Sequence, residues 1–187
     1  METTKKISYI ASCLFGYLCL GLSLFISVEV IMRKVFGKSL QGADELGGYV
    51  LAIGAALTFS IALIGNNHIR IDMFHYKMPP KMQAVMNWIA TVSTIFLAAL
   101  LAFSAFRVLR ETLSYGSTAP TPWATPLHYP QIPWTLGLIL FFALAAYQAI
   151  GATRLLLSGR WDDLRVLYQP KGSADEVKEE LRDLQQR

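Results

Sequence analysis

The side chains that could do chemistry in this sequence lie at the ends of long apolar segments. Glu29 and Arg33 are four positions apart, which places them on one face of a helix, where opposite charges pair. An acidic group in apolar surroundings can instead relay protons. Because Glu29 is only one turn from Arg33, near the end of its apolar run, the spacing favours a paired helix end over a proton relay.

A second acidic pair, Asp44 and Glu45, begins the next apolar segment. Acidic side chains at this position interact favourably with the positive end of a helix dipole, so helix capping is sufficient to explain the pair. Glu45 could also bind a basic residue of the preceding connector, or of a partner.

The most charge-dense connector has the sequence HIRID at residues 68–72. In an extended backbone, His68, Arg70 and Asp72 form one edge and the isoleucines between them form the other. The charged edge suits lipid headgroups, and the apolar edge suits acyl chains or a protein groove. In a helix, His68, Asp72 and His75 would instead share a face and resemble a metal site with two histidines and one carboxylate. The alternating isoleucines argue against that geometry.

Four runs without charge must position these groups, and each has about the 20 residues that cross a hydrocarbon core about 30 Å thick. None alternates between apolar and polar residues as a barrel strand does, and lipid offers no partners for free backbone groups, so the runs are helices. The sequence therefore predicts an all-α membrane protein with interfacial connectors. Its four transmembrane helices are expected at about 7–32, 45–65, 82–106 and 132–154.

The length of 187 residues, 53% of them hydrophobic, leaves no room for a separate soluble domain. We expect a four-helix membrane domain at 1–158 and a polar cytoplasmic tail at 159–187. The first run is longer than the apolar part of a signal peptide and lacks a small-residue cleavage site, so it should remain as a helix. Ser173 and Glu176 form a capping box, which predicts a short cytoplasmic C-terminal helix.

Basic residues near the ends of the spans predict the orientation, because they concentrate on the cytoplasmic side. The distribution favours both termini in the cytoplasm. It also explains the net charge of +4 without any binding of nucleic acid. The predicted inner side has Lys5, Lys6, Arg70, Lys77, Lys81, Arg154, Arg160 and Arg165, and the outer side has Arg33, Lys34, Lys38, Arg107 and Arg110.

Small residues recur every four positions on the second and third spans, and such stripes allow helix backbones to approach closely in lipid. The two stripes either pack on each other within a four-helix bundle, or at least one of them faces another subunit. The stripes are Gly48, Ala52, Ala56 and Ser60, and Ala90, Thr94, Ala98 and Ala102.

The connector before the last span is rich in proline and aromatic residues. Trp123, Tyr129 and Trp134 prefer the headgroup level, so the segment should lie along the outer interface or pack on protein. Its prolines are expected to interrupt any regular helix; they are Pro120, Pro122, Pro126, Pro130 and Pro133.

Taken in order, these motifs resemble the small integral-membrane (DctQ-type) subunit of tripartite ATP-independent periplasmic (TRAP) transporters, over most of residues 10–158. The resemblance rests on the sequence around the ends of the four spans. The matching segments are RKVF at 33–36, DEL at 44–46 with Tyr49, HIRID at 68–72, TPL at 125–127, PQ at 130–131, and the entry into the last helix at 134–137.

The resemblance implies a three-part, sodium-coupled secondary transporter for small organic acids in a bacterial inner membrane. A periplasmic binding protein would capture the substrate, and a large permease subunit would hold the substrate and sodium sites. The small subunit would be neither an enzyme nor a cofactor carrier. It would brace the scaffold of the large subunit, contact membrane lipids and help dock the binding protein. Candidate interface or positioning residues are Arg33, Lys34, Glu45, Gly48, Ala52, Ala56, His68, Arg70, Asp72, Trp123 and Trp134.

Two other classes of protein remain open. A proton-coupled small multidrug-type exporter, acting as a homodimer, also has four helices and one acidic residue in the first, but its glutamate belongs in mid-membrane and its chain is shorter. A haem-carrying electron-transfer bundle needs axial histidines within its helices. All three histidines of this chain lie in the expected connectors.

Overall fold

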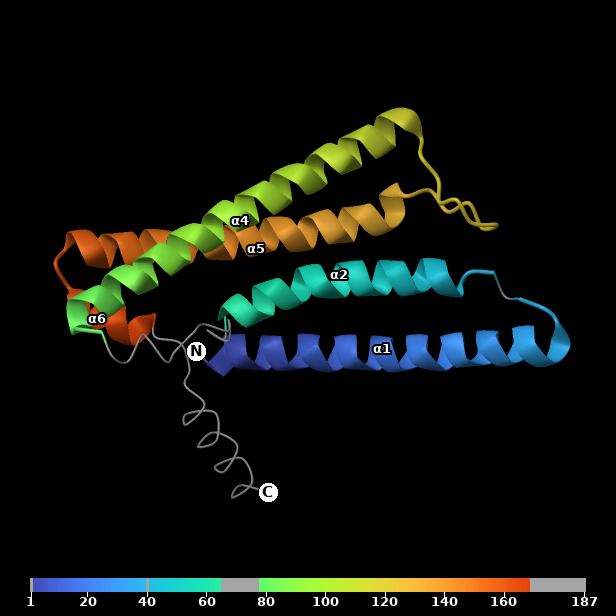
Figure 1. Ribbon diagram of the computed structural model, residues 1–187, viewed down its shortest axis with the longest axis horizontal. Helices are drawn as coiled ribbons and strands as arrows, with labels where there is room; N and C mark the ends of the chain where they lie inside the picture. Colours follow the sequence, from blue (N-terminus) through green and yellow to red (C-terminus); the bar gives the residue numbers. More distant parts are fainter. Residues whose placement is uncertain (1, 40, 65–77, 169–187) are drawn as a thin grey trace, which may run out of the picture. The chain divides into compact units, whose positions relative to one another are not determined.

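A computed structural model describes residues 2–39, 41–64 and 78–168 of the chain, and most of these residues form helices (Figure 1). The helices α1, α2, α4 and α5 are long and apolar enough to cross a membrane, which confirms the predicted all-α fold with four transmembrane helices. A short helix, α6, follows them. The bounds are α1 Glu2–Phe36, α2 Ala43–Ile64, α4 Pro80–Tyr115, α5 His128–Leu157 and α6 Trp161–Leu167.

The helices continue beyond the spans that the uncharged runs predict. Helix α4 has 36 residues, which corresponds to about 54 Å at 1.5 Å per residue, against about 30 Å of hydrocarbon. Its last turns include an ion pair between Arg107 and Glu111, 3.6 Å apart. These turns therefore suit the headgroup region or the aqueous phase.

Helix α5 begins earlier than the prolines suggest. It starts at His128, so Pro130 and Pro133 lie within its first two turns. The expectation that all five prolines interrupt helix is wrong for these two. Pro130 lies in the first turn, where N–H groups have no intrahelical acceptor, whereas Pro133 lies inside the helix and removes one of its backbone hydrogen bonds. The remaining three prolines lie in the connector 116–127.

The chain divides into two compact units, which we describe separately. Unit 1 comprises Met1–Ile61 and Leu100–Phe141, and unit 2 comprises Ala62–Ala99 and Phe142–Arg187.

In unit 1, α2 packs closely on α5. A Cβ atom on Gly137 would lie 3.0 Å from the Cβ of Ala56, closer than most Cβ contacts, so a larger residue there would require the two helices to shift. Ala56, Ala105 and Leu138 form a buried cluster there, and Trp134 packs against it. Small residues thus bring three helices into contact in this unit.

Helix α1 lies beside α2 in unit 1 (Figure 1). The ring of Phe15 fills the space beside Gly54, where an added Cβ would lie 1.8 Å from a ring carbon. Only 6% of the apolar window of α1 is buried, against 39% for α5. Most of α1 is therefore left for lipid or for another protein.

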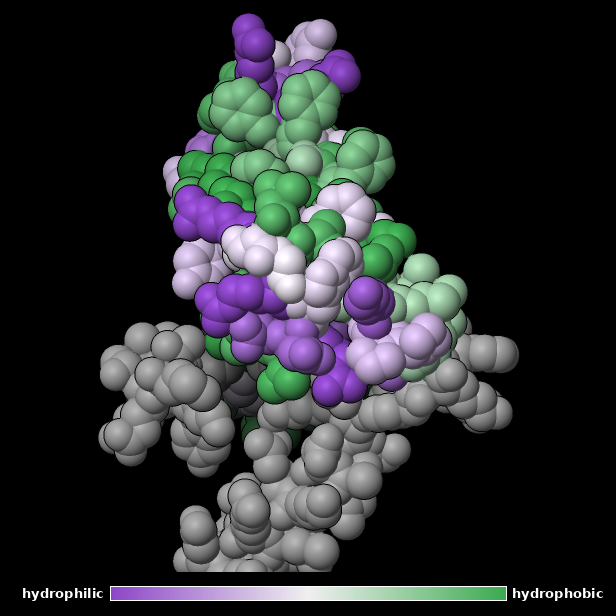
Figure 2. Space-filling view, turned by 90° about the vertical axis from the view of Figure 1, so that its left-hand side faces the viewer, coloured by the Kyte–Doolittle hydropathy of each residue, from purple (hydrophilic) through white to green (hydrophobic). Residues whose placement is uncertain are grey.

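Unit 2 is organised around α6. Its Leu164 is completely buried with Ala84 of α4 and Ala152 of α5, and Trp88 packs against this cluster. Trp88 Nε1 also donates a hydrogen bond to Thr153 Oγ1 at 3.0 Å. Hydrophilic side chains gather where α6 meets the adjoining ends of α4 and α5 (Figure 2). The segment after α5 thus folds back onto the helix ends.

The turn between α5 and α6 uses Gly159, whose φ is +70°. After α6, the hydroxyl of Tyr168 lies over Gly151, where an added Cβ would be 2.5 Å from it. Burial, with a smaller contribution from Tyr147, raises the pKa of Tyr168 above its ordinary value, so this phenol is neutral at physiological pH. The helix predicted from Ser173 lies outside the described residues, and the boundary at residue 158 stays a prediction.

Candidate functional site

The proline-rich connector 116–127 forms a closed hairpin. The Ala119 N–H donates to the Thr125 carbonyl at 2.9 Å, and the Leu127 N–H donates to the Ser117 carbonyl at 3.0 Å. The three prolines of this segment have no N–H to leave unsatisfied. The contacts of the hairpin with Glu45 and Gly42 show that it packs on protein, which is one of the two arrangements that the sequence left open.

The tip of the hairpin is bonded to the first turn of α2 through Glu45. The Glu45 side chain is buried, with 7% of its surface exposed. Tyr49 donates its hydroxyl to Glu45 Oε1 at 2.9 Å, Thr121 Oγ1 donates to Oε2, and Thr125 is a further hydrogen-bonding partner. Hydrogen bonds to an ionised acceptor are among the stronger ones in proteins. Glu45 thus joins two segments that are 76 residues apart.

Trp123 makes a second contact, between the hairpin and Gly42, the residue that precedes α2. An added Cβ on Gly42 would lie 2.2 Å from the indole ring, so the ring occupies the space that a side chain at residue 42 would need. The other side of the ring is open, since 48% of Trp123 is exposed. Trp123 therefore contacts this subunit with one face and offers the other to lipid or protein.

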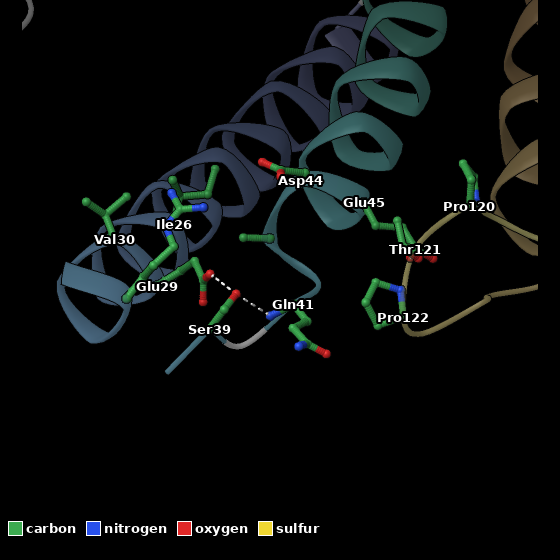
Figure 3. Close-up of a pocket in the computed structure, with 12 residues that line it drawn as sticks. Ile26, Glu29, Val30, Ser39, Gln41, Asp44, Glu45, Pro120, Thr121 and Pro122 are labelled. Carbon is green, nitrogen blue, oxygen red and sulfur yellow. Dashed lines mark hydrogen bonds between the residues drawn. The ribbon is translucent and has the colours of Figure 1, made fainter. Parts of the chain in front are cut away.

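Glu29 closes the corner between α1 and α2. It is 5% exposed and accepts a hydrogen bond from Ser39 Oγ at 2.5 Å (Figure 3). Ser39 Oγ in turn accepts one from the backbone N–H of Gln41 at 3.1 Å. The sequence predicted Arg33 as the partner of Glu29; the structure gives it Ser39, because the connector folds back across the end of α1.

A cavity of about 250 Å³ lies between this corner and the tip of the hairpin (Figure 3). The volume and the mixture of carboxylates, a guanidinium and hydroxyls suit a charged or polar side chain of a partner. The arrangement can bind and orient charged or polar groups. The charged or hydroxyl-bearing lining residues are Glu29, Arg33, Ser39, Asp44, Glu45 and Thr121.

The remaining predicted interface residues divide between inner and outer positions. Ala56 and Trp134 pack inside unit 1, whereas Gly48 and Ala52 are exposed on the outside of α2. Among the described residues, no atom lies within 4 Å of the position of an added Cβ on Gly48. The stripe on α2 therefore packs internally at one end and is open at the other.

The charged residues among the predicted interface residues form two groups, one within the described residues and one outside them. Arg33 lines the cavity and Lys34 is exposed near it. His68, Arg70 and Asp72 lie outside the described residues, so their roles, and the metal-binding alternative, stay predictions.

The helices and the cavity define the class of the protein: a multi-pass helical membrane protein with a polar cavity at one end of unit 1. A family model described as tripartite ATP-independent periplasmic transporters, DctQ component, matches residues 22–155. The chain therefore belongs to the DctQ family and is a small membrane subunit of a TRAP transporter in the inner membrane. Its partners in such a transporter are a large permease subunit and a binding protein. Comparison with curated proteins gives no match.

Proposed function

We propose that this subunit belongs to a sodium-coupled, binding-protein-dependent transporter for small organic acids. In this proposal it braces the static scaffold of the large permease subunit, contacts the surrounding lipids and helps dock the periplasmic binding protein. Both termini lie in the cytoplasm, which places the α1–α2 corner and the hairpin on the periplasmic side.

The observation that carries the bracing role is the open apolar surface of α1 and α2. Because little of α1 is buried within the subunit, this surface must contact lipid or another protein. Lipid gives little net drive for helix association, so partner helices need close backbone approach. The outer face of α2 allows it at Gly48 and Ala52, whereas the exposed side of α1 carries Leu20 and Leu24, which suit acyl chains.

The sequence also supports placing the substrate and sodium sites in the large subunit. Residues 46–64 and 82–106 contain no charged side chain. Intramembrane sites for ions and acidic substrates usually have ionisable residues or broken helices near mid-membrane. The lack of charged side chains in these segments favours a structural role for the small subunit, and the proposal includes no cofactor bound to it.

The proposal is tested by purifying the tagged chain from its native membrane in mild detergent and identifying what accompanies it by mass spectrometry. A stoichiometric, much larger polytopic protein supports the proposal. A lone homodimer would contradict it and favour the exporter alternative.

We predict that Gly48→Leu greatly reduces copurification of the large subunit, because the leucine side chain would occupy the open space over the small-residue face of α2. Gly21→Leu is the matched control, since Gly21 also lies on an exposed helix face with no atom within 4 Å of an added Cβ. It should leave the amount of copurified partner unchanged. Loss of the partner in the Gly21 variant alone would move the interface to α1.

We also predict that Arg70→Glu impairs assembly or uptake without changing which substrate is transported. The substitution reverses a charge at the predicted inner surface, where a basic side chain interacts favourably with anionic headgroups. Arg70→Lys, which keeps the charge, serves as the control. Normal copurification and normal uptake in the Arg70→Glu variant would contradict the prediction.

A further inference from the structure

We propose that Glu45 is a positioning residue that holds the 116–127 hairpin as a preformed docking surface for the periplasmic binding protein. The inference rests on the proposed function and specifies which part of the subunit meets the binding protein. The contact surface is the hairpin tip, and Glu45 acts through Thr121 and Thr125.

The buried Glu45 carboxylate depends on the hydrogen bonds that it accepts. A buried carboxylate is tolerated only when hydrogen bonds replace the water that it has lost. Here the donors are neutral hydroxyls from α2 and from the hairpin tip. Removing the Thr121 hydroxyl while the tip stays in place would leave the carboxylate one donor short in a buried position, which is costlier than losing an exposed hydrogen bond.

The hairpin has few other constraints on its position. It is short and includes Pro120, Pro122 and Pro126, which donate no backbone hydrogen bonds. An isolated two-stranded hairpin is marginally stable at best in water. The bonds to Glu45 and the packing of Trp123 on Gly42 therefore decide where the tip lies.

The tip of the hairpin presents an exposed apolar surface beside charged residues. Pro120, Pro122 and Trp123 are exposed next to the cavity that Arg33 and Asp44 line. An aromatic ring flanked by prolines is a rigid apolar anchor, and charged groups around it resemble the rim of a protein interface. A surface already held in place loses little entropy on binding. At the predicted periplasmic end, the soluble binding protein is the component that such a surface can reach.

The test uses the complete transporter in proteoliposomes, with uptake measured against the concentration of substrate-loaded binding protein. We expect Thr121→Val to raise the half-saturating concentration of binding protein by about tenfold, as loss of a hydrogen bond to a charged group implies. The maximal uptake rate and the amount of copurified large subunit should not change. Thr118→Val is the matched control, because Thr118 is an exposed threonine of the same hairpin, and its half-saturating concentration should equal that of the wild type.

Hydrogen exchange measured by mass spectrometry on the same samples reports the position of the hairpin directly. Exchange of the Ala119 and Leu127 amides should become faster in Thr121→Val and stay unchanged in Thr118→Val. Faster exchange with an unchanged half-saturating concentration would overturn the docking role. Loss of the large subunit from the Thr121 variant would overturn it too, since the hairpin would then serve assembly.

Failure of the proposed function has a different signature. Wild-type uptake that does not depend on the binding protein would overturn both the proposed function and this inference, before any variant is made. If wild-type uptake depends on the binding protein but Thr121→Val has the wild-type half-saturating concentration, the inference is overturned and the proposed function stays intact.

Discussion

Replacing Gly137 by leucine should force α2 and α5 apart in unit 1 and destabilise the folded subunit by about 3 kcal/mol, toward the upper end of overpacking effects. An added Cβ would lie 3.0 Å from the Cβ of Ala56 and 3.5 Å from its carbonyl carbon. Backbone atoms cannot rotate away as a flexible side chain can. The close contact is also where the dispersion attraction between helices is gained in lipid.

Unfolding of the purified subunit in mixed micelles, titrated with a denaturing detergent and followed by circular dichroism, measures this effect. Gly21→Leu makes the same chemical change at a position where no atom of the described residues lies within 4 Å of the added Cβ. It should leave stability unchanged or slightly raised, because leucine favours helix more than glycine does. Equal midpoints for the two variants would contradict the close packing of α2 on α5.

Leu164→Ala should release α6 from unit 2. Leu164 is completely buried with Ala84 and Ala152, and removing a buried leucine side chain costs about 3 kcal/mol when the cavity does not collapse. Helix α6 has only seven residues, too few for a stable isolated helix. Loss of this packing should therefore unfold α6 locally while the transmembrane helices persist.

Hydrogen exchange of the amides of residues 161–167 follows this release, and tryptophan emission supports it because Trp88 and Trp161 pack on the same cluster. Val166→Ala is the control on the same helix, since Val166 is 64% exposed, and it should exchange like the wild type. Slow exchange of α6 in the Leu164 variant would show that other contacts hold the helix.

The membrane fold could be predicted because its signal is local. A long run without charge contains the information for a spanning helix, and charged residues at its ends mark where the helix leaves the hydrocarbon. The family could be recognised because its motifs lie at those ends. Gly48 and Ala52 could be named as candidate interface residues because a stripe of small residues is also visible in the sequence.

Contacts between distant segments could not be predicted in this way. No local pattern pairs Glu45 with Thr121, and nothing in the sequence shows that Gly137 lies against Ala56. The division of the α2 stripe has a geometric cause. At 3.6 residues per turn, each four-residue step advances about 40° around the helix, so Gly48 and Ser60 point in directions about 120° apart. A stripe of this period therefore serves two different surfaces.

The hydrogen bonds that hold the hairpin also predict how this end of the subunit responds to its surroundings. Ion pairs at an aqueous surface weaken as dissolved salt rises, because mobile ions screen charges beyond about 10 Å at 0.1 M. Among the described residues, the partners of Glu45 are uncharged hydroxyls, and short hydrogen bonds in a buried site are little affected by screening. The hairpin should thus keep the same geometry on Glu45 at low and at high salt concentration.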